Sequence, residues 1–156
     1  MKRKVNIELF DEYEKVNFYT LQFEGEDSEA DKFLDKFPVG CGYDDDIDIL
    51  IKWIEKIGER GALERYFRYE GKEKDNVMAI PIETTSLRLY VIRLSENIIV
   101  LGNGGVKKTR TYNEDKHLKQ CVELLQNIDG LIRTRMRSDK IVLYDKKLLG
   151  NLTFNV

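Results

Sequence analysis

The sequence contains few of the residues on which several common classes of protein depend. Among 156 residues there are two cysteines, one histidine and two prolines. Two cysteines form no disulfide framework, and Cys41 and Cys121 lack metal-ligand spacing. No segment approaches the ~18 apolar residues of a membrane helix, and no apolar segment typical of a secretory signal follows residues 1–5. We therefore expect a globular protein of the reducing cytoplasm.

Length and charge indicate one domain with an uneven charge distribution. A chain of 156 residues and 18.3 kDa, with 42% hydrophobic and 35% charged residues, is sufficient for one core. The net charge is −2, but residues 1–60 carry 16 acids and 9 bases, whereas residues 61–156 carry 12 acids and 17 bases. The chain can therefore present a basic face although it is acidic as a whole; scattered solvated charge is the alternative.

The first 40 residues predict a strand and a helix behind an N-terminal extension. Residues 1–15 are mostly polar or charged, and we expect either a mobile arm or a short edge strand. Residues 16–23 are rich in β-branched and aromatic side chains, which is typical of a strand. Ser28 is a suitable N-cap for a helix that Pro38 ends.

A second helix is expected from residue 44, where three aspartates would favour the positive end of the helix dipole. Gly58 and Gly61 should end it, and Trp53 lies off its apolar stripe. The stripe has the 3.6-residue period of an amphipathic helix and consists of Ile47, Leu50, Ile51, Ile54 and Ile57.

The second half predicts a β-rich segment, one helix and a closing hairpin. The helix should be capped by Asn113 and continue past Gly130, and the hairpin should turn at residues 150–151. Because strands and helices are segregated, the fold class is α+β, with an antiparallel sheet after the first two helices. The expected strands are residues 66–69, 76–80, 87–94, 98–101, 141–144 and 152–156.

Two motif-like segments are rejected on their chemistry. Asp44, Asp46, Asp48 and Glu55 have the spacing of a calcium loop, but Ile49 occupies the position where the sharp turn needs glycine. The glycine-rich segment 102–109 has Val106 where a phosphate-binding loop needs glycine before its lysine. These glycines are better suited to a turn or bulge with positive φ. We expect no metal and no nucleotide cofactor.

Histidine and cysteine chemistry is also restricted. With His117 as the single histidine, a two-histidine ribonuclease mechanism is excluded, and a structural role for His117 is favoured. Cys121 falls on an apolar helix stripe and should be core. Cys41 lies between glycines, and a catalytic pair with His117 stays open.

Basic residues gather around the central strands, with Tyr90 and Tyr112 among them. Strand alternation places Arg88 and Arg93 on opposite faces, so that one of them lies near the 107–110 segment. Together they would form a phosphate-binding surface on which Tyr112 could stack a base. Pairing of Arg88 with Glu83 or Glu96 is the equally weighted alternative. The basic set is Arg68, Lys72, Arg88, Arg93, Lys107, Lys108 and Arg110.

The segment 87–101, followed by Gly104-Gly105-Val106-Lys107-Lys108-Thr109, resembles the RelE/HigB-type toxins of bacterial toxin–antitoxin pairs, in particular their phage-related HigB-like branch. The shared pattern is an arginine-bearing strand, a hairpin into an apolar strand that ends near glycine, and a Lys-Lys-Thr-like segment before a helix. The resemblance implies a single RelE-like domain, with residues 1–15 as its extension.

The resemblance further implies a toxin that cuts mRNA, typically on the translating ribosome, and that a partner antitoxin silences. The ribose 2′-OH attacks the adjacent phosphate without a metal, and cationic groups stabilise the phosphorane. By position, Arg88 would hold the scissile phosphate, Lys108 would stabilise it, and Tyr112 would stack or assist proton transfer. Further phosphate contacts would come from Arg68, Arg93, Lys107 and Arg110.

Two departures from the family keep other functions open. Typical members have about one hundred residues and are basic, whereas this chain is longer and acidic. A non-catalytic module on the same fold, acting for example on a topoisomerase, is the runner-up, and a phage-related binding protein is a third reading.

Overall fold

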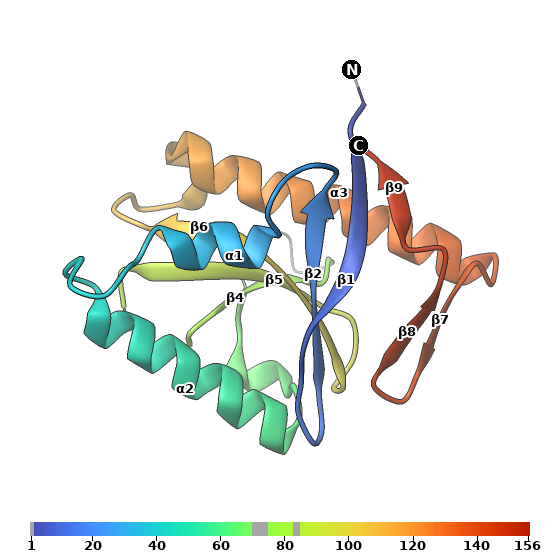
Figure 1. Cartoon of the computed structure of the whole chain (residues 1–156), viewed down its shortest axis with the longest axis horizontal. Coiled ribbons are helices and arrows are strands. Elements are labelled where there is room, and N and C mark those ends of the chain that lie inside the picture. The colour runs from blue at the N-terminus through green and yellow to red at the C-terminus, as the bar shows by residue number, and fades with distance from the viewer. Residues whose placement is uncertain (1, 70–74, 83–84) are drawn as a thin grey trace.

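A computed structural model of the chain describes residues 2–69, 75–82 and 85–156. These residues form an α+β fold with a seven-stranded sheet, three α-helices and a separate hairpin (Figure 1). The helices are α1 (Glu29–Asp35), α2 (Asp44–Arg60) and α3 (Lys116–Arg137), with 3-10 turns η1 (Glu64–Tyr66) and η2 (Tyr112–Glu114). The strands are β1 (Lys4–Glu12), β2 (Asn17–Phe23), β3 (Arg68–Tyr69), β4 (Val77–Ile80), β5 (Leu87–Arg93), β6 (Ile98–Val106), β7 (Ile141–Tyr144), β8 (Lys147–Gly150) and β9 (Thr153–Asn155).

The large sheet is mixed, whereas the sequence predicted an antiparallel one. Its strand order is β3-β4-β5-β6-β2-β1-β9, and every neighbouring pair is antiparallel except β2 and β6. The parallel pair joins Asn17–Thr20 of β2 to Ile98–Leu101 of β6. The α+β class is confirmed. The parallel pairing of β2 with β6 could not be predicted from local sequence patterns.

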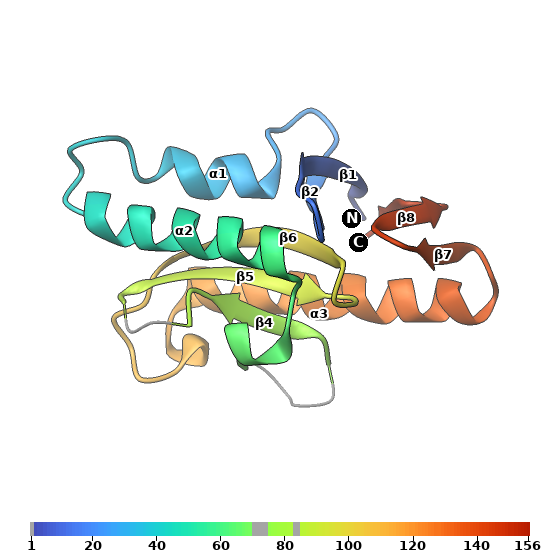
Figure 2. The same cartoon turned by 90° about the horizontal axis from the view of Figure 1, so that it is seen from below.

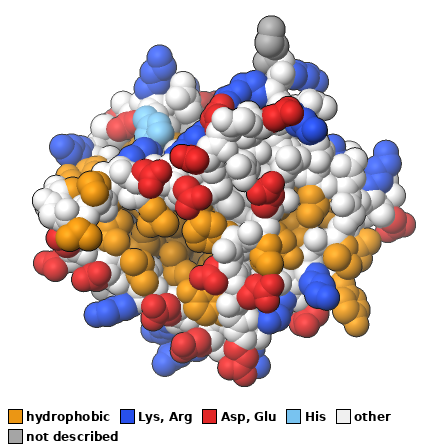
Figure 3. All heavy atoms as spheres, viewed as in Figure 1, with side chains coloured by type: hydrophobic (Ala, Val, Ile, Leu, Met, Phe, Trp, Pro, Cys, Tyr) orange, Lys and Arg blue, Asp and Glu red, His pale blue; other side chains and the backbone are white. Residues whose placement is uncertain are grey.

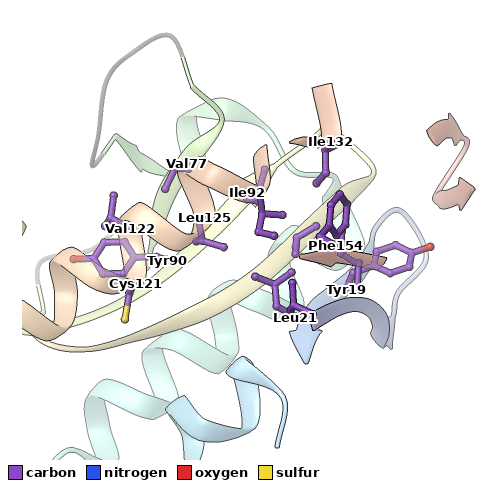
Figure 4. Close-up of a cluster of buried hydrophobic side chains, with 14 of the residues drawn as sticks. Tyr19, Leu21, Val77, Tyr90, Ile92, Cys121, Val122, Leu125, Ile132 and Phe154 are labelled. Atoms are coloured by element: carbon purple, nitrogen blue, oxygen red, sulfur yellow. The ribbon is translucent and has the colours of Figure 1, made fainter. Parts of the chain in front are cut away.

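The sheet separates two hydrophobic cores. Figure 2 shows α1 and α2 on one side of the sheet and α3 on the other. Side chains alternate along β5, so Leu89 and Val91 pack on the α1–α2 side while Tyr90 and Ile92 pack on the α3 side. In Figure 4 the ring of Tyr90 lies beside Val122 and Cys121 of α3. The predicted alternation of this strand is therefore confirmed.

The first two helices follow their sequence signals closely. The Ser28 hydroxyl accepts a hydrogen bond from the backbone N–H of Asp31 at 3.1 Å and so caps α1. Helix α2 passes through Gly58 and ends only at Gly61, whose φ of 106° takes the chain out of the helix. Trp53 packs against Tyr66, with ring centroids 5.6 Å apart.

The N-terminal segment belongs to the sheet and is not a mobile arm. Strand β1 pairs with β2 along its length and with β9 through Lys4–Asn6. Val5 and Ile7 are buried, because β1 covers part of the same core as α3. Of the two expectations for residues 1–15, the strand is the correct one.

Two expectations for the last third of the chain are corrected. Helix α3 is capped by Asp115, whose carboxylate accepts from the Leu118 N–H at 3.0 Å, and not by Asn113, which lies in η2. The closing hairpin turns at Asp145, where φ is 54°, so β7 pairs with β8. Strand β9 leaves this hairpin because its partner is β1, at the other end of the sequence.

The glycine-rich segment continues β6 and contains the predicted bulge. Leu89 pairs with Gly104 and Val91 with Leu101, so one residue of β5 faces two of β6. The glycines of this segment keep strand backbone, and the expected positive φ is wrong. Their function is close approach, because a Cβ on Gly104 would overlap the Arg88 carbonyl oxygen of the neighbouring strand.

Candidate functional site

Several of the predicted site residues meet where β6 ends. Arg88 of β5 lies opposite Gly105, and the Lys107 N–H bonds to the Ser86 carbonyl at 2.7 Å. The chain then runs through the exposed side chains of Lys108 and Arg110 toward helix α3. The β5–β6 register thus brings the strand arginine and the basic segment to one edge of the fold.

Arg88 is anchored in protein and not presented to solvent. It is 9% exposed, and its Nη1 donates to the Thr85 carbonyl at 2.6 Å and to the Leu87 carbonyl at 2.8 Å. Glu83, one of the carboxylates considered for it, lies outside the described residues, as does Lys72 of the basic set. These contacts make Arg88 an organiser of the start of β5, which pairs with the end of β6.

Tyr112 opens the turn η2 directly before α3, and its ring is partly buried against the α3-side core. The backbone around it is held by neighbouring side chains: the Thr109 hydroxyl donates to the Thr111 carbonyl at 2.6 Å, and Glu114 accepts from the Arg110 N–H at 3.3 Å. Tyr112 is therefore a fixed aromatic group four residues after Lys108.

The other two predicted arginines do not join this group. The Nε of Arg93 donates to the Ala62 carbonyl at 2.6 Å, next to the C-terminus of α2. Arg93 is five residues along β5 from Arg88, about 17 Å at the usual strand rise. Arg68 pairs with Ala79, on the far side of β4 from β5. A single surface that includes both residues and the 107–110 segment is not formed.

The structure adds a polar cluster that sequence reasoning missed. Lys36, just past α1, lies with its Nζ 2.8 Å from Asn103 Oδ1, 2.7 Å from the Gly104 carbonyl oxygen and 2.7 Å from His117 Nε2. An ammonium group has three N–H donors, and these three acceptors satisfy all of them. Burial lowers the pKa of Lys36 from its ordinary value of 10.5.

The tautomer of His117 decides which of two neighbours its Nε2 bonds. A neutral ring with its proton on Nδ1 would accept from Lys36 at Nε2, whereas a ring with its proton on Nε2 would donate to the Gly104 carbonyl oxygen, 2.9 Å away. The cluster joins segments 81 residues apart in sequence, so no local pattern could have revealed it.

Neither cysteine forms an activated nucleophile with this histidine. Cys121 Sγ lies 3.6 Å from His117 Nε2, one helical turn away, and burial raises the pKa of its thiol to about 12. A thiol with this pKa stays protonated at neutral pH and is a poor nucleophile. Cys41 is exposed in the α1–α2 connection, and the thiol beside the histidine is that of Cys121. The structure thus gives no support to the open Cys41–His117 pair.

Apolar side chains are also exposed over α1 and α2, on the face of the molecule that Figure 3 shows. Figure 3 shows this patch as a broad orange area with acidic side chains around it. Val39 in the connecting loop is 98% exposed, and Ile51 of α2 is 42% exposed. One hollow here is lined by residues that include Phe37, Ile47 and Asp48. Exposed apolar patches with polar rims are typical of protein interaction sites.

Within the described ranges no group of three or more histidine, cysteine or acidic side chains could hold a metal ion, and no helix is long and apolar enough to cross a membrane. No protein-family model, curated protein or solved structure matches the chain.

Proposed function

We propose that the chain is a metal-independent endoribonuclease of the RelE/HigB type, acting on mRNA as the toxin of a toxin–antitoxin pair. The observation that carries the proposal is the edge at the end of β6, where exposed Lys108 and Arg110 follow directly after the strand opposite Arg88. Its local order of arginine-bearing strand, hairpin, basic segment and long helix agrees with the pattern that suggested the family.

The chemistry expected there is an in-line transfer. The 2′-oxygen of the ribose forms a bond to phosphorus while the bond from phosphorus to the 5′-oxygen breaks, leaving a 2′,3′-cyclic phosphate and a 5′-hydroxyl. The phosphorane gains negative charge, which Lys108 and Arg110 would stabilise. The 2′-hydroxyl must lose a proton and the leaving oxygen must gain one. Tyr112, four residues after Lys108, is the side chain assigned to stacking or proton transfer.

The proposal is tested by removing the exposed cations together. Lys108→Ala/Arg110→Ala leaves the buried core untouched, and Lys140→Ala/Lys147→Ala, near and in the exposed β7–β8 hairpin, is a control with the same loss of charge. In a bacterial host, we expect the wild type and the control to arrest growth and to create new mRNA 5′ ends, and the test variant to do neither. New ends at wild-type frequency in the test variant would refute the site.

Salt dependence gives a second measurement on the purified protein. Each phosphate contact on single-stranded RNA contributes about 0.7 to the slope of log affinity against log salt concentration. Losing two contacts should therefore lower this slope by about 1.4, while the hairpin control keeps the wild-type slope. Equal slopes in all three proteins would show that these cations do not bind phosphate.

A protein-binding role is the second candidate, and the exposed apolar face of α1 and α2 favours it. The antitoxin, or another protein target, would dock on this face in the proposed system. If wild-type expression arrests growth without new mRNA ends, a protein target is supported in place of the nuclease. In that case Val39→Asp, on the exposed loop of this face, should relieve the arrest.

A further inference from the structure

A cavity of about 420 Å³ lies between α1 and α3, beside the polar cluster of Lys36 and His117. Its volume is within the range of about 300–1,000 Å³ typical of small-molecule sites. Its walls come from Arg3 just before β1 and from the end of β2, α1, β6 and α3, which meet only in the tertiary fold. The cavity is distinct from the exposed cations to which the nuclease reaction was assigned.

One wall of the cavity is the side chain of Arg3, which itself stacks on the buried ring of Phe23. The guanidinium carbon of Arg3 lies 4.1 Å from the centroid of the Phe23 ring, and both residues line the cavity. Leu124 of α3 adds an apolar surface. Aromatic rings and guanidinium planes are the surfaces on which proteins stack unpaired RNA bases. This wall thus suits a flat heterocycle.

The remaining walls carry hydrogen-bonding groups. Glu29 is 7% exposed, and its carboxylate forms an ion pair with Lys32 at 2.9 Å. The amide of Gln120 and the imidazole of His117 line the cavity from α3. A buried carboxylate can only accept hydrogen bonds, whereas an amide both donates and accepts. The cavity therefore favours a ligand that presents N–H donors together with an acceptor.

The cationic side chains at the cavity already have partners in the protein, so the cavity does not favour a free anion. Arg3 and Lys32 both form ion pairs with Glu26, and Lys32 also pairs with Glu29. The ammonium of Lys36 is held by its three acceptors. With these charges compensated, the recognition that remains is that of a neutral ring with a polar edge.

We infer that this cavity binds a nucleobase, with guanine as the best fit. The N1–H of guanine would donate to the Glu29 oxygen that Lys32 does not hold, while Gln120 meets an acceptor and the ring stacks on the Arg3 guanidinium. The inference rests on the proposed function, for which it names a base-specific subsite. A Cβ on Gly105, the residue opposite Arg88, would lie 3.6 Å from His117 Cδ2, so the cavity adjoins the proposed RNA site.

The test is nucleotide binding to the isotope-labelled full chain, followed by NMR without any RNA cleavage. We expect GMP to shift the side-chain amide signal of Gln120 and the ring signals of Phe23, with an affinity at least 3-fold above that for AMP, CMP or UMP. Glu29→Gln and Gln120→Leu should each weaken GMP binding at least 5-fold. Lys119→Ala, at the residue before Gln120 in α3 and outside the cavity, is the control and should bind as the wild type does.

Three results would overturn the inference. One is the absence of shifts at these positions with all four nucleotides at 10 mM. The second is equal shifts with inorganic phosphate, which would identify an anion site. The third is unchanged GMP binding in both cavity variants. The test of the nuclease proposal is independent of this one. GMP binding without mRNA cleavage would support the nucleobase site and refute the nuclease. Cleavage without GMP binding would support the nuclease and refute the nucleobase site.

Discussion

The close approach of β5 and β6 makes Gly104→Ala a sensitive test of the fold around the candidate site. A Cβ at this position would overlap the carbonyl oxygen of Arg88 and lie 2.9 Å from its carbonyl carbon and 3.1 Å from the Leu89 Cα. All three are backbone atoms of the adjacent strand, so no side-chain rotation relieves the overlap. The two strands must separate, and they lie at the centre of the sheet.

The size of the effect follows from this geometry. A separation of about 1 Å breaks or lengthens the nearby interstrand hydrogen bonds, each worth about 1 kcal/mol net. It also disturbs side chains packed on both faces of β5, and overpacking of this kind costs about 1–3 kcal/mol. We expect Gly104→Ala to lower the free energy of unfolding by about 2–4 kcal/mol, a large part of the 5–15 kcal/mol typical of a domain.

The matched control is the same substitution at Gly130. This glycine lies inside α3, and no heavy atom lies within 4 Å of an added Cβ. Alanine favours a helix interior over glycine, so Gly130→Ala should stabilise the protein by about 0.5–1 kcal/mol. Urea unfolding followed by circular dichroism measures both changes. A Gly104→Ala protein within 0.5 kcal/mol of wild type would refute the described register of β5 and β6.

Four further predictions concern capping, the reactivity of the thiols, the pH dependence of stability, and the N-terminal strand. Asp115→Ala should destabilise the protein by about 1 kcal/mol, whereas Asn113→Ala should change stability by less than 0.5 kcal/mol, measured by urea unfolding; the opposite order would restore the cap to Asn113. At pH 8 a thiol-specific reagent should modify Cys41 quickly and Cys121 only on unfolding, since with a pKa of about 12 only about one Cys121 thiol in ten thousand is ionised. Because the folded chain keeps the Cys121 proton while the unfolded chain loses it near pH 9, stability should fall as pH rises from about 9 toward 12, and less so in Cys121→Ala. Limited proteolysis should leave residues 4–12 intact, and rapid cleavage there would contradict their place in the sheet.

Signals carried by neighbouring residues could be interpreted correctly from the sequence. The serine cap of α1, the apolar stripe of α2, the alternation of β5 and the tight β5–β6 hairpin all depend on residues a few positions apart. Local backbone preference and burial of one face determine such features, so the α+β class followed from the sequence. The basic segment after β6 was found in the same way, and register then brought it beside Arg88.

The pairing of strands that lie far apart in the sequence could not be predicted from the sequence alone. Residues 1–15 carried too few apolar side chains to choose between arm and strand, and only contacts with β2 and β9 decided the question. The same contact removed β9 from the hairpin that local spacing had suggested, and the parallel pairing of β2 with β6 gave the sheet its mixed character. These choices depend on which strand edges meet, and no short segment encodes that.

The sequence by itself therefore determined the three helices and the central strands, the side chains of β5 that face each core, and the place where exposed cations follow a strand. The tertiary structure decided which polar groups meet. It withdrew Arg88 from solvent, separated Arg93 from the basic segment, and placed Lys36 against His117 beside a cavity lined by Glu29. The physical reason is that burial and hydrogen-bond partners are properties of the packed chain, since each group finds its partner only after distant segments have come together.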